Sequence, residues 1–427
     1  MESMKASVIF PATAAQVEPS APPNPSEVSP SRDNATSPTL DAEGLRTLVR
    51  QIREWAGELG FGKVGIADTD LSHAEPGLQQ WLDDGCHGDM DYMATHGMKR
   101  ARPAELVPGT VRVISARMNY LPSDTDMATW REREAARAAV PGEAIVSIYA
   151  RGRDYHKVVR NRLQQLADRI ETAIGPFGYR AFTDSAPVLE VELAQKAGLG
   201  WRGKHTLLLS RDAGSLFFLG EIFVDVPLPV DVEADEDGSA ADASAAPTGG
   251  AHAMQRGEHC GQCQRCREVC PTGAITEAFR VDARLCVSYL TIEHKGAIPE
   301  PLRAKMGNRI YGCDDCQLYC PWNKFAQPSP LPDFAPRHRL DCASLVELFA
   351  WSEAEFMEKL AGSPIRRIGH ERWLRNLAVG LGNALRETKA ADARTPLREA
   401  LLARRDHTSA LVREHVEWAL AQEGATV

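Results

Sequence analysis

Residues 260–271 read Cys260-Gly-Gln-Cys263-Gln-Arg-Cys266-Arg-Glu-Val-Cys270-Pro271, and a related run further along reads Cys313-Asp-Asp-Cys316-Gln-Leu-Tyr-Cys320-Pro321. Cys286 stands alone between the two runs, and 26 residues separate it from Cys313. The two runs and Cys286 contain eight of the ten cysteines in the chain. Cysteines at such short, repeated spacings predict a segment that binds metal.

The first run has the spacing of bacterial ferredoxins. In that pattern three closely spaced thiolates hold one 4Fe-4S cube, and the fourth thiolate, directly before proline, reaches across to a second cube. Two cubes need eight thiolates, and eight are present. The second run is a longer form of the same motif, because its first cysteine is Cys286 and a long insertion separates that residue from Cys313. The cross-over rule predicts that one cluster is held by Cys260, Cys263, Cys266 and Cys320, and the other by Cys270, Cys286, Cys313 and Cys316.

Structural zinc and disulfides would also use several cysteines, but neither fits this pattern well. Zinc sites use pairs of ligands separated by a longer loop, which the Cys-x-x-Cys-x-x-Cys triplet does not match. Disulfides would require an oxidising compartment and usually a small secreted chain. Iron-sulfur clusters are therefore the favoured interpretation. Cys86 and Cys342 stand apart from the rest, and we expect both to be ordinary buried thiols.

The composition is that of a soluble globular protein, with 43% hydrophobic and 25% charged residues. A chain of 427 residues is too long for one ordinary core and suggests two or three domains. No apolar run approaches the length of a membrane span, so we expect no membrane association. Residues 1–40 lack both the apolar core of a secretory signal and a twin-arginine pair, which favours the cytoplasm.

The net charge of −9 gives little information about partners, because much of it lies in one segment. Seven acids between residues 225 and 242, with no Lys or Arg among them, leave about −2 for the rest of the chain. These acids are Asp225, Asp231, Glu233, Asp235, Glu236, Asp237 and Asp242.

Hydrophobic periodicity predicts alternating helices and strands in the first half of the chain. Apolar residues recur at helical spacing from Leu45 to Leu59 and from Val159 to Ile174. Short β-rich runs predict strands at 64–67, 111–120 and 144–150. A helix is expected over 188–197, with Pro187 in its first turn, followed by paired strands at 205–210 and 216–224. This alternation predicts a layered α/β domain.

The second half of the chain is organised differently. Residues 328–336 are rich in proline and are expected to form a linker, and residues 344–423 have helical patterning throughout. The segments 373–385 and 396–420 resemble stacked helical hairpins of the HEAT kind. We expect a disordered extension at 1–40, an α/β domain at 41–230, a flexible acidic insert at 231–254, a ferredoxin-type domain at 255–335 and a helical domain at 336–427.

Catalytic candidates in the α/β part are few. There is no G-x-G-x-x-G after a strand and no phosphate-binding loop. Asp154-Tyr155-His156 matches the start of the D-x-H-x-x-G signature of histidine-ligated cobalamin, but Val159 occupies the glycine position. Asp184 lies beside Ser185 at a predicted strand end, where catalytic carboxylates are common, although helix capping explains that position equally well.

Several motifs together resemble the epoxyqueuosine reductase family, the cobalamin-dependent iron-sulfur enzymes that complete queuosine in the tRNA anticodon. The resemblance extends from about residue 45 to residue 420. It rests on Tyr149-Ala-Arg-Gly-Arg-Asp-Tyr-His156, Thr183-Asp-Ser-Ala-Pro187, Gly198-Leu-Gly-Trp-Arg-Gly-Lys-His205, Ile310-Tyr-Gly-Cys-Asp-Asp-Cys316 and Cys320-Pro-Trp-Asn323.

This resemblance implies that the α/β domain binds cobalamin without an amino-acid ligand below cobalt, which agrees with the incomplete D-x-H motif. It also implies that Asp184 is the proton donor to the epoxide oxygen, with a pKa raised by burial against the corrin. The residues expected to border the corrin are Leu208, Ser210, Ser288, Cys313 and Asp314. Leu208 departs from the polar residue expected there, so its contact would be apolar or made by the backbone.

The expected partners are a tRNA anticodon stem-loop and an external electron donor, and the protein is expected to be a monomer. Basic residues of the helical tail are candidates for the tRNA contact, namely Arg366, Arg367, Arg372, Arg375, Arg404 and Arg405. Two competing functions fit the sequence less well. A ferredoxin-type electron carrier would need neither the α/β half nor the tail, and a corrinoid reductive dehalogenase would typically carry a twin-arginine signal.

Overall fold

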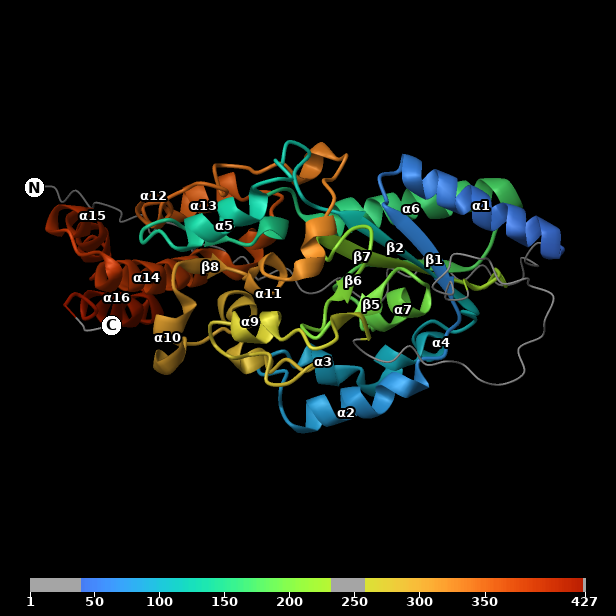
Figure 1. Cartoon of the computed structure of the whole chain (residues 1–427), viewed down its shortest axis with the longest axis horizontal. Coiled ribbons are helices and arrows are strands. Elements are labelled where there is room, and N and C mark those ends of the chain that lie inside the picture. Colours follow the sequence, from blue (N-terminus) through green and yellow to red (C-terminus); the bar gives the residue numbers. More distant parts are fainter. Residues whose placement is uncertain (1–39, 232–257, 425–427) are drawn as a thin grey trace, which may run out of the picture. The chain divides into compact units, whose positions relative to one another are not determined.

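The computed structural model describes residues 40–231 and 258–424, which fall within one compact unit (Figure 1). The predicted extension and acidic insert lie outside these residues, except for Leu40 and Asp231. We expected Asp231 to begin the flexible acidic insert, but it is hydrogen-bonded to β1 (Lys63–Ala67). The Ile66 N–H donates to Asp231 Oδ2 at 2.8 Å, and the Asp231 N–H donates to the Ile66 carbonyl at 2.9 Å. The ordered first part therefore continues to residue 231.

A four-stranded antiparallel sheet organises the first half of the chain. Its strand order is β1-β2-β7-β4, so β7 pairs along both of its edges. The strands are β1 (Lys63–Ala67), β2 (Arg112–Asn119), β4 (Tyr179–Phe182) and β7 (Phe217–Val224). Side chains alternate between the two faces along each strand, and helices cover both faces. The predicted mixed α/β architecture is confirmed at this level.

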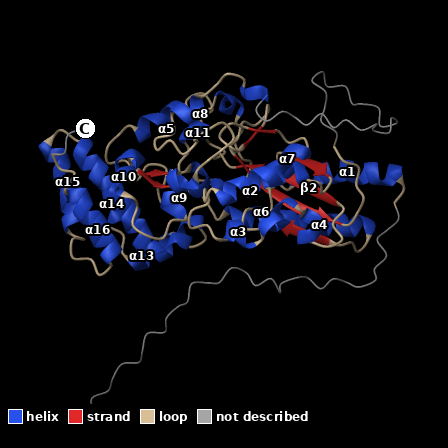
Figure 2. Ribbon diagram, turned by 90° about the horizontal axis from the view of Figure 1, so that it is seen from below, coloured by secondary structure: helices blue, strands red, loops and turns tan. Residues whose placement is uncertain are grey.

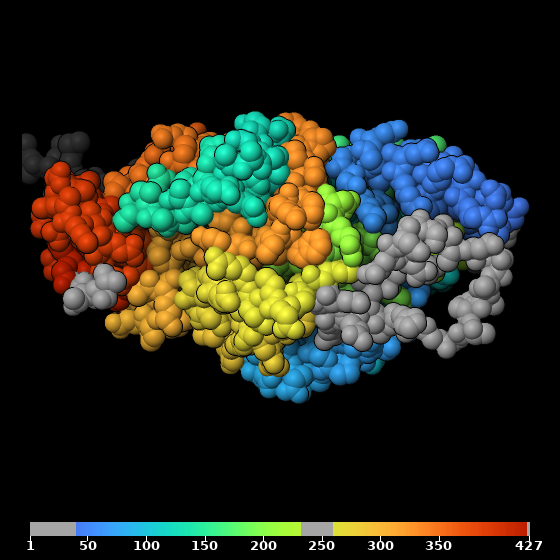
Figure 3. Space-filling view, viewed as in Figure 1, coloured from blue at the N-terminus to red at the C-terminus, as the bar shows by residue number. Residues whose placement is uncertain are grey.

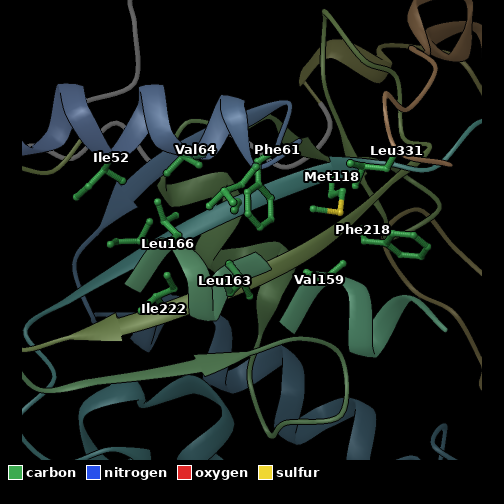
Figure 4. Packing of buried hydrophobic residues seen from close by; sticks show 14 of the residues in the cluster. Ile52, Phe61, Val64, Met118, Val159, Leu163, Leu166, Phe218, Ile222 and Leu331 are labelled. Atoms are coloured by element: carbon green, nitrogen blue, oxygen red, sulfur yellow. The ribbon is translucent and has the colours of Figure 1, made fainter. Parts of the chain in front are cut away.

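Two long helices, α1 (Ala42–Glu58) and α6 (Tyr155–Ile174), pack on one face of the sheet. Figure 4 shows Ile52 of α1 and Leu163 and Leu166 of α6 in the same apolar layer as Ile222 of β7. Each helix begins at an aspartate whose side chain accepts a backbone N–H, Asp41 for α1 and Asp154 for α6. The short helix α7 (Glu190–Lys196) lies against the sheet and contributes to separate buried clusters. This core fixes where α6 begins.

Three predicted elements are wrong in extent or pairing. The strand expected at 144–150 shrinks to β3 (Ile145–Val146), because residues 148–150 turn into a 3-10 helix. The strand β6 (Leu208–Leu209) pairs with β5 (Trp201–Arg202) and not with β7, since β2 and β4 already occupy both edges of β7. The helix expected from Pro187 begins at Glu190, because residues 184–187 form bends.

The cysteine-rich segment consists of short elements joined by loops. Its strand β8 (Arg309–Tyr311) pairs in parallel with β3, which lies far earlier in the chain. Apolar residues after the second cysteine run, among them Leu331 and Phe334, join the core under the sheet. The helices of this segment are α8 (Arg265–Glu268), α9 (Val287–Ile292), α10 (Glu300–Met306) and α11 (Asp315–Leu318).

The tail is helical, as predicted, and Figure 2 shows helices throughout it. Its central helix is α14 (Gly369–Glu387), whose buried side includes Trp373, Leu377 and Leu381. Pro396 lies inside α15 (Ala391–Leu402) rather than at the start of a helix. The other tail helices are α12 (Leu345–Phe349), α13 (Glu353–Lys359), α15 (Ala391–Leu402) and α16 (Ala410–Leu420), and the remaining helices of the first half are α2 (Glu75–Asp83), α3 (Tyr92–Thr95), α4 (Pro103–Leu106) and α5 (Trp130–Ala138).

Three of the basic tail residues donate to backbone carbonyls within the fold. Arg375 is fully buried and donates to the carbonyls of Leu290, His294 and Gly296. Arg372 likewise donates to the Ile292 carbonyl at 2.9 Å, and Arg404 donates to the carbonyls of residues 349 and 351. These guanidinium groups satisfy backbone carbonyls that helices and strands leave unpaired. Arg366, Arg367 and Arg405 remain exposed.

Two further expectations concern the isolated cysteines and membranes. Cys86 is buried as expected, but Cys342 is exposed, because it lies in a turn before α12. Among the helices of residues 40–231 and 258–424, none is long and apolar enough to cross a membrane.

Candidate functional site

The first predicted cysteine group surrounds one cavity. Cys260, Cys263, Cys266 and Cys320 all line a space of about 500 Å³. Leu209 and Trp322 line the cavity, and Trp201 packs with them against Cys260 and Cys320. The structure therefore brings Cys320 to the other three thiols, although it lies sixty residues after Cys260 in the sequence.

His205, which lines this cavity, and Trp201, which packs against Cys320, each have a buried N–H group that fits a cluster with acceptor sulfurs. His205 Nδ1 accepts the Leu207 N–H at 3.2 Å, so the ring proton is on Nε2. Burial lowers the pKa of His205 to about 4 and keeps the ring neutral. Within the described part of the chain, neither His205 Nε2 nor Trp201 Nε1 has a hydrogen-bond partner, although both are buried. Donors to cluster sulfur are a known means of setting cluster potential, and these two groups could serve in that way.

The second predicted group consists of four half-buried thiols. Burial raises the pKa of the Cys316 thiol well above its usual value, and the charges of Cys286, Asp314 and Cys270 raise it further. Burial also raises the pKa of Cys313 and Cys286. Thiols of this kind lose their protons to a metal rather than to water. The charge of Cys266, in the first group, also raises the pKa of Cys316.

Asp184 lies on the loop between β4 and α7, in a left-handed conformation with φ of 53°. Its carboxylate meets two side chains from the start of α6. The Tyr155 hydroxyl donates to Asp184 Oδ2 at 2.5 Å, and His156 Nε2 lies 2.8 Å from the same oxygen. The other ring nitrogen, His156 Nδ1, lies 2.8 Å from Asp154 Oδ1. The Asp154-Tyr155-His156 fragment thus belongs to the site as a support for Asp184, with both imidazole nitrogens engaged.

The charge state of Asp184 differs from the expectation. Desolvation raises the pKa of Asp184, but hydrogen bonds from His156 and Tyr155 outweigh it and hold the pKa below its usual value. Desolvation lowers the pKa of His156, yet Asp154 and Asp184 raise it to about 9. At neutral pH the proton is therefore on His156. The expectation that the pKa of Asp184 is raised is wrong for the polypeptide alone, because that expectation did not include the hydrogen bond from His156.

Two further carboxyl groups lie next to the Asp184 loop, those of the half-buried Glu190 and the buried Glu221. The Asp184 N–H donates to Glu190 Oε1 at 2.5 Å. Glu221, on β7, is fully buried beside Glu190. Desolvation, followed by the charge of Asp184, raises the pKa of Glu190 to about 8, and desolvation and Glu190 raise that of Glu221 well above its usual value. Both groups hold protons near neutrality, and no sequence motif indicated this pair.

An aromatic cluster and one arginine complete the surroundings. Tyr155 stacks on Phe218 with ring centroids 4.2 Å apart, and Tyr149 meets Tyr155 edge-on at 5.7 Å. Arg367, from the 3-10 turn before α14, pairs with Glu293 at 3.2 Å. Burial lowers the pKa of Arg367, but Glu293, Tyr311 and Asp184 raise it overall, so this tail residue lies near the Asp184 carboxylate.

The residues expected to border the corrin fall into two places. Asp314 accepts hydrogen bonds from the Ser147 hydroxyl and the Ile148 N–H, beside the half-buried Cys313. Ser288 is half-buried on α9, one residue after a buried valine. Leu208 and Ser210 are buried in the hairpin region of β6, where Ser210 accepts from Arg117 and donates to Asp212. Their role at a corrin remains a prediction.

Two family models match the chain. One, described as "4Fe-4S double cluster binding domain", matches residues 259–323, and the second, "Epoxyqueuosine reductase QueG, DUF1730", matches residues 100–185. The epoxyqueuosine reductase of Burkholderia pseudomallei is 64% identical over 406 residues, which cover 92% of this chain and 96% of that protein.

Solved structures agree in fold. The epoxyqueuosine reductase of Streptococcus thermophilus has a TM-score of 0.70 at 24% identity, covering 88% of this chain and 90% of that one. An epoxyqueuosine reductase solved with a tRNA-Tyr epoxyqueuosine-modified stem loop has a TM-score of 0.69 at 23% identity, covering 89% of this chain and all of that one.

The fold and the matched cluster segment define an iron-sulfur oxidoreductase with a double 4Fe-4S cluster domain beside a mixed α/β part and a helical C-terminal region. Relatives of matching length share more than half of their residues with it. The chain belongs to the epoxyqueuosine reductase family, which confirms the family predicted from its motifs.

Proposed function

We propose that the protein reduces epoxyqueuosine to queuosine at the wobble position of a tRNA anticodon, using electrons passed through two 4Fe-4S clusters to a bound cobalamin. The relative with a bound epoxyqueuosine-modified stem loop supports tRNA as the substrate class. The observation that carries the proposal is the set of contacts around Asp184. A carboxylate with a protonated histidine and a tyrosine on one oxygen is suited to deliver a proton.

Removal of the epoxide oxygen consumes two electrons and two protons and releases one water. Cobalamin, when bound and reduced, would supply the nucleophile for opening the epoxide. His156 holds a proton at neutral pH on the nitrogen that faces Asp184. That proton moves from His156 Nε2 to Asp184 Oδ2 and then to the epoxide oxygen as the carbon-oxygen bond breaks. Tyr155 holds the same carboxylate oxygen in place.

The engaged nitrogens of His156 fit a cobalamin with no protein ligand below the metal. Leu208, Ser210, Ser288, Cys313 and Asp314 would border the corrin. Asp314 is already held by Ser147 and Ile148, so it would present a fixed carboxyl group beside the second cluster.

We assign one cluster to the cavity of Cys260, Cys263, Cys266 and Cys320, and the other to Cys270, Cys286, Cys313 and Cys316. The cavity and the unpartnered donors of Trp201 and His205 support the first assignment. The helical region would contact the tRNA through Arg366 and Arg367, the protein would act as a monomer, and the reaction would take place in the cytoplasm with its tRNA substrate.

Replacement of Asp184 by asparagine tests the proposal. Asp184→Asn keeps the shape of the side chain but cannot carry the proton, so single-turnover reduction of a modified stem loop should slow by about 10² to 10⁴. Iron content of about eight atoms per chain and cobalamin binding should not change. Wild-type single-turnover rates in this variant would show that the carboxylate has a structural role only.

A further inference from the structure

The first cysteine group is the place where electrons can enter. Of the eight thiols, all of which lie in described residues, Cys263 is exposed and the others are half-buried or buried. Gly261 and Gln262 beside it are exposed too. Figure 3 shows the first part of the cysteine-rich segment, in yellow, at the surface of the molecule. An external donor can therefore reach the first group through Cys263, whereas all four thiols of the second group are half-buried.

The rim of this cavity is basic. Among the described residues, its lining includes Lys204, Arg211, Arg265 and Lys324, and no carboxylate. Lys204 is used internally, since its ammonium donates to the carbonyls of Gly261 and Cys263. Arg265 and Lys324 are exposed. Arg265 faces Glu268 at 3.6 Å, an exposed pair that neutralises little in water. The positive rim lies on a chain whose net charge is −9, so it is a local feature.

Exposed aromatic rings lie directly beside these cations. Tyr319 is 37% exposed and Phe325 is 36% exposed, and they flank Cys320 and its following proline. The Arg265 guanidinium lies 5.5 Å from the Tyr319 ring centroid, and the Lys324 ammonium lies 4.7 Å from that of Phe325. Accessible aromatic rings combined with arginine are the composition typical of protein docking surfaces.

We infer that Arg265, Lys324, Tyr319 and Phe325 form a docking surface for an acidic protein that carries single electrons at low potential. This inference rests on the proposed function, which requires two electrons per turnover. Each docking event oxidises the carrier by one electron and reduces the first cluster by one, so two events supply one turnover. An acidic carrier is repelled by most of this negatively charged chain and attracted at the rim, which selects the productive orientation.

The test compares two electron donors on the complete, cluster-loaded enzyme. The variant Arg265→Glu/Lys324→Glu should lower kcat/KM for reduced flavodoxin, used as the acidic carrier, by about 10-fold or more at low salt. Turnover at saturating dithionite, a small reductant that needs no docking surface, should not change. For the wild type, kcat/KM for flavodoxin should fall as salt is raised, and the variant should lose that dependence.

A matched control changes the same charge elsewhere. Arg50 on α1 and Arg160 on α6 are exposed, and Arg50→Glu/Arg160→Glu should behave like the wild type with both donors. If the reversal of Arg265 and Lys324 disturbs folding, as iron content would show, Arg265→Gln/Lys324→Gln gives the same comparison with a smaller change.

Unchanged kcat/KM for flavodoxin in the rim variant would overturn the docking surface. An equal loss with dithionite and flavodoxin, at full iron content, would overturn it as well, because the rim would then act on the cluster itself. If the wild-type enzyme fails to reduce the modified stem loop with flavodoxin and also with dithionite, that failure would instead contradict the proposed function.

Discussion

A carboxyl group that donates a proton near neutral pH needs either a raised pKa or a neighbour that keeps the proton for it. Asp184 has such a neighbour. His156, whose pKa is raised to about 9, lies 2.8 Å from the carboxylate oxygen and is itself anchored by Asp154. The acid of this site is therefore the Asp184 and His156 pair, and its titration belongs to both groups.

The pH dependence of the chemical step should follow His156. Its pKa in the fold lies above the usual 6.5, so its stabilising ion pair is fully present below about pH 6.5 and is lost as the pH rises through about 9. Single-turnover rates of pre-reduced enzyme should fall over that same upper range. In Asp154→Asn, which removes one cause of the raised pKa, the fall should begin at lower pH. A rate that stays level through pH 9 in the wild type would exclude His156 as the proton source.

Glu190 should act as a positioning residue for Asp184. A non-glycine residue with φ of 53° is held against an unfavourable backbone energy of about 1 to 3 kcal/mol, and the Glu190 carboxyl accepts the N–H of that residue. Glu190→Ala removes the acceptor, and we expect kcat to fall by about 3- to 10-fold with little change in KM. Glu190→Gln keeps an acceptor oxygen and should restore most of kcat. Equal losses in both variants would show that the acid itself is required.

At the scale of elements, the sequence predicted what local periodicity controls. The helices α1, α6 and α14 follow from apolar spacing, and the cysteine motifs indicate the clusters directly. The pairing of β6 with β5 could not be predicted, because it depends on β7 having both edges occupied. Tyr155 and His156 were visible as a motif, but their contact with Asp184 depends on the packing of α6 on the sheet. The pairing of Glu190 with Glu221 depends on how α7 packs.

The helix α14 gives a prediction about stability. Arg375 is fully buried and donates to one carbonyl of α9 and two carbonyls of the loop after it, at 2.7 to 2.8 Å. Arg375→Met should lower the free energy of unfolding by about 3 kcal/mol, because buried carbonyls lose their donors. Thermal unfolding of the cluster-loaded protein measures this, with the exposed Arg398→Met on α15 as control. A stability equal to that of the control would mean that different donors or water replace the guanidinium.

At the scale of the whole molecule, the three predicted domains share their cores. Leu331 and Phe334 from the cysteine-rich segment pack under the sheet of the first half. Val146 from the first half and Ile310 from the cysteine-rich segment pack among the tail helices. The domain boundaries stay predictions, but parts that share apolar cores cannot move freely past each other. This connection brings Arg367 of the tail close to Asp184, which lies in another predicted domain.

The position of Arg367 leads to a prediction about the tRNA. Arg366 and Arg367 are exposed in the turn before α14, whereas Arg372, Arg375 and Arg404 donate to backbone carbonyls. The double variant Arg366→Ala/Arg367→Ala therefore removes accessible positive charge from this part of the tail. If these groups neutralise backbone phosphates, stem-loop binding should weaken. The slope of log affinity against log salt should fall by about 0.7 to 0.9 for each lost contact.

Arg50→Ala/Arg160→Ala, on the exposed side of α1 and α6, should leave affinity and slope unchanged. Iron content must stay at the wild-type value for the comparison to hold. An unaltered slope in the Arg366 and Arg367 variant would place the phosphate contacts elsewhere, and Arg367 would then serve through its ion pair with Glu293 alone.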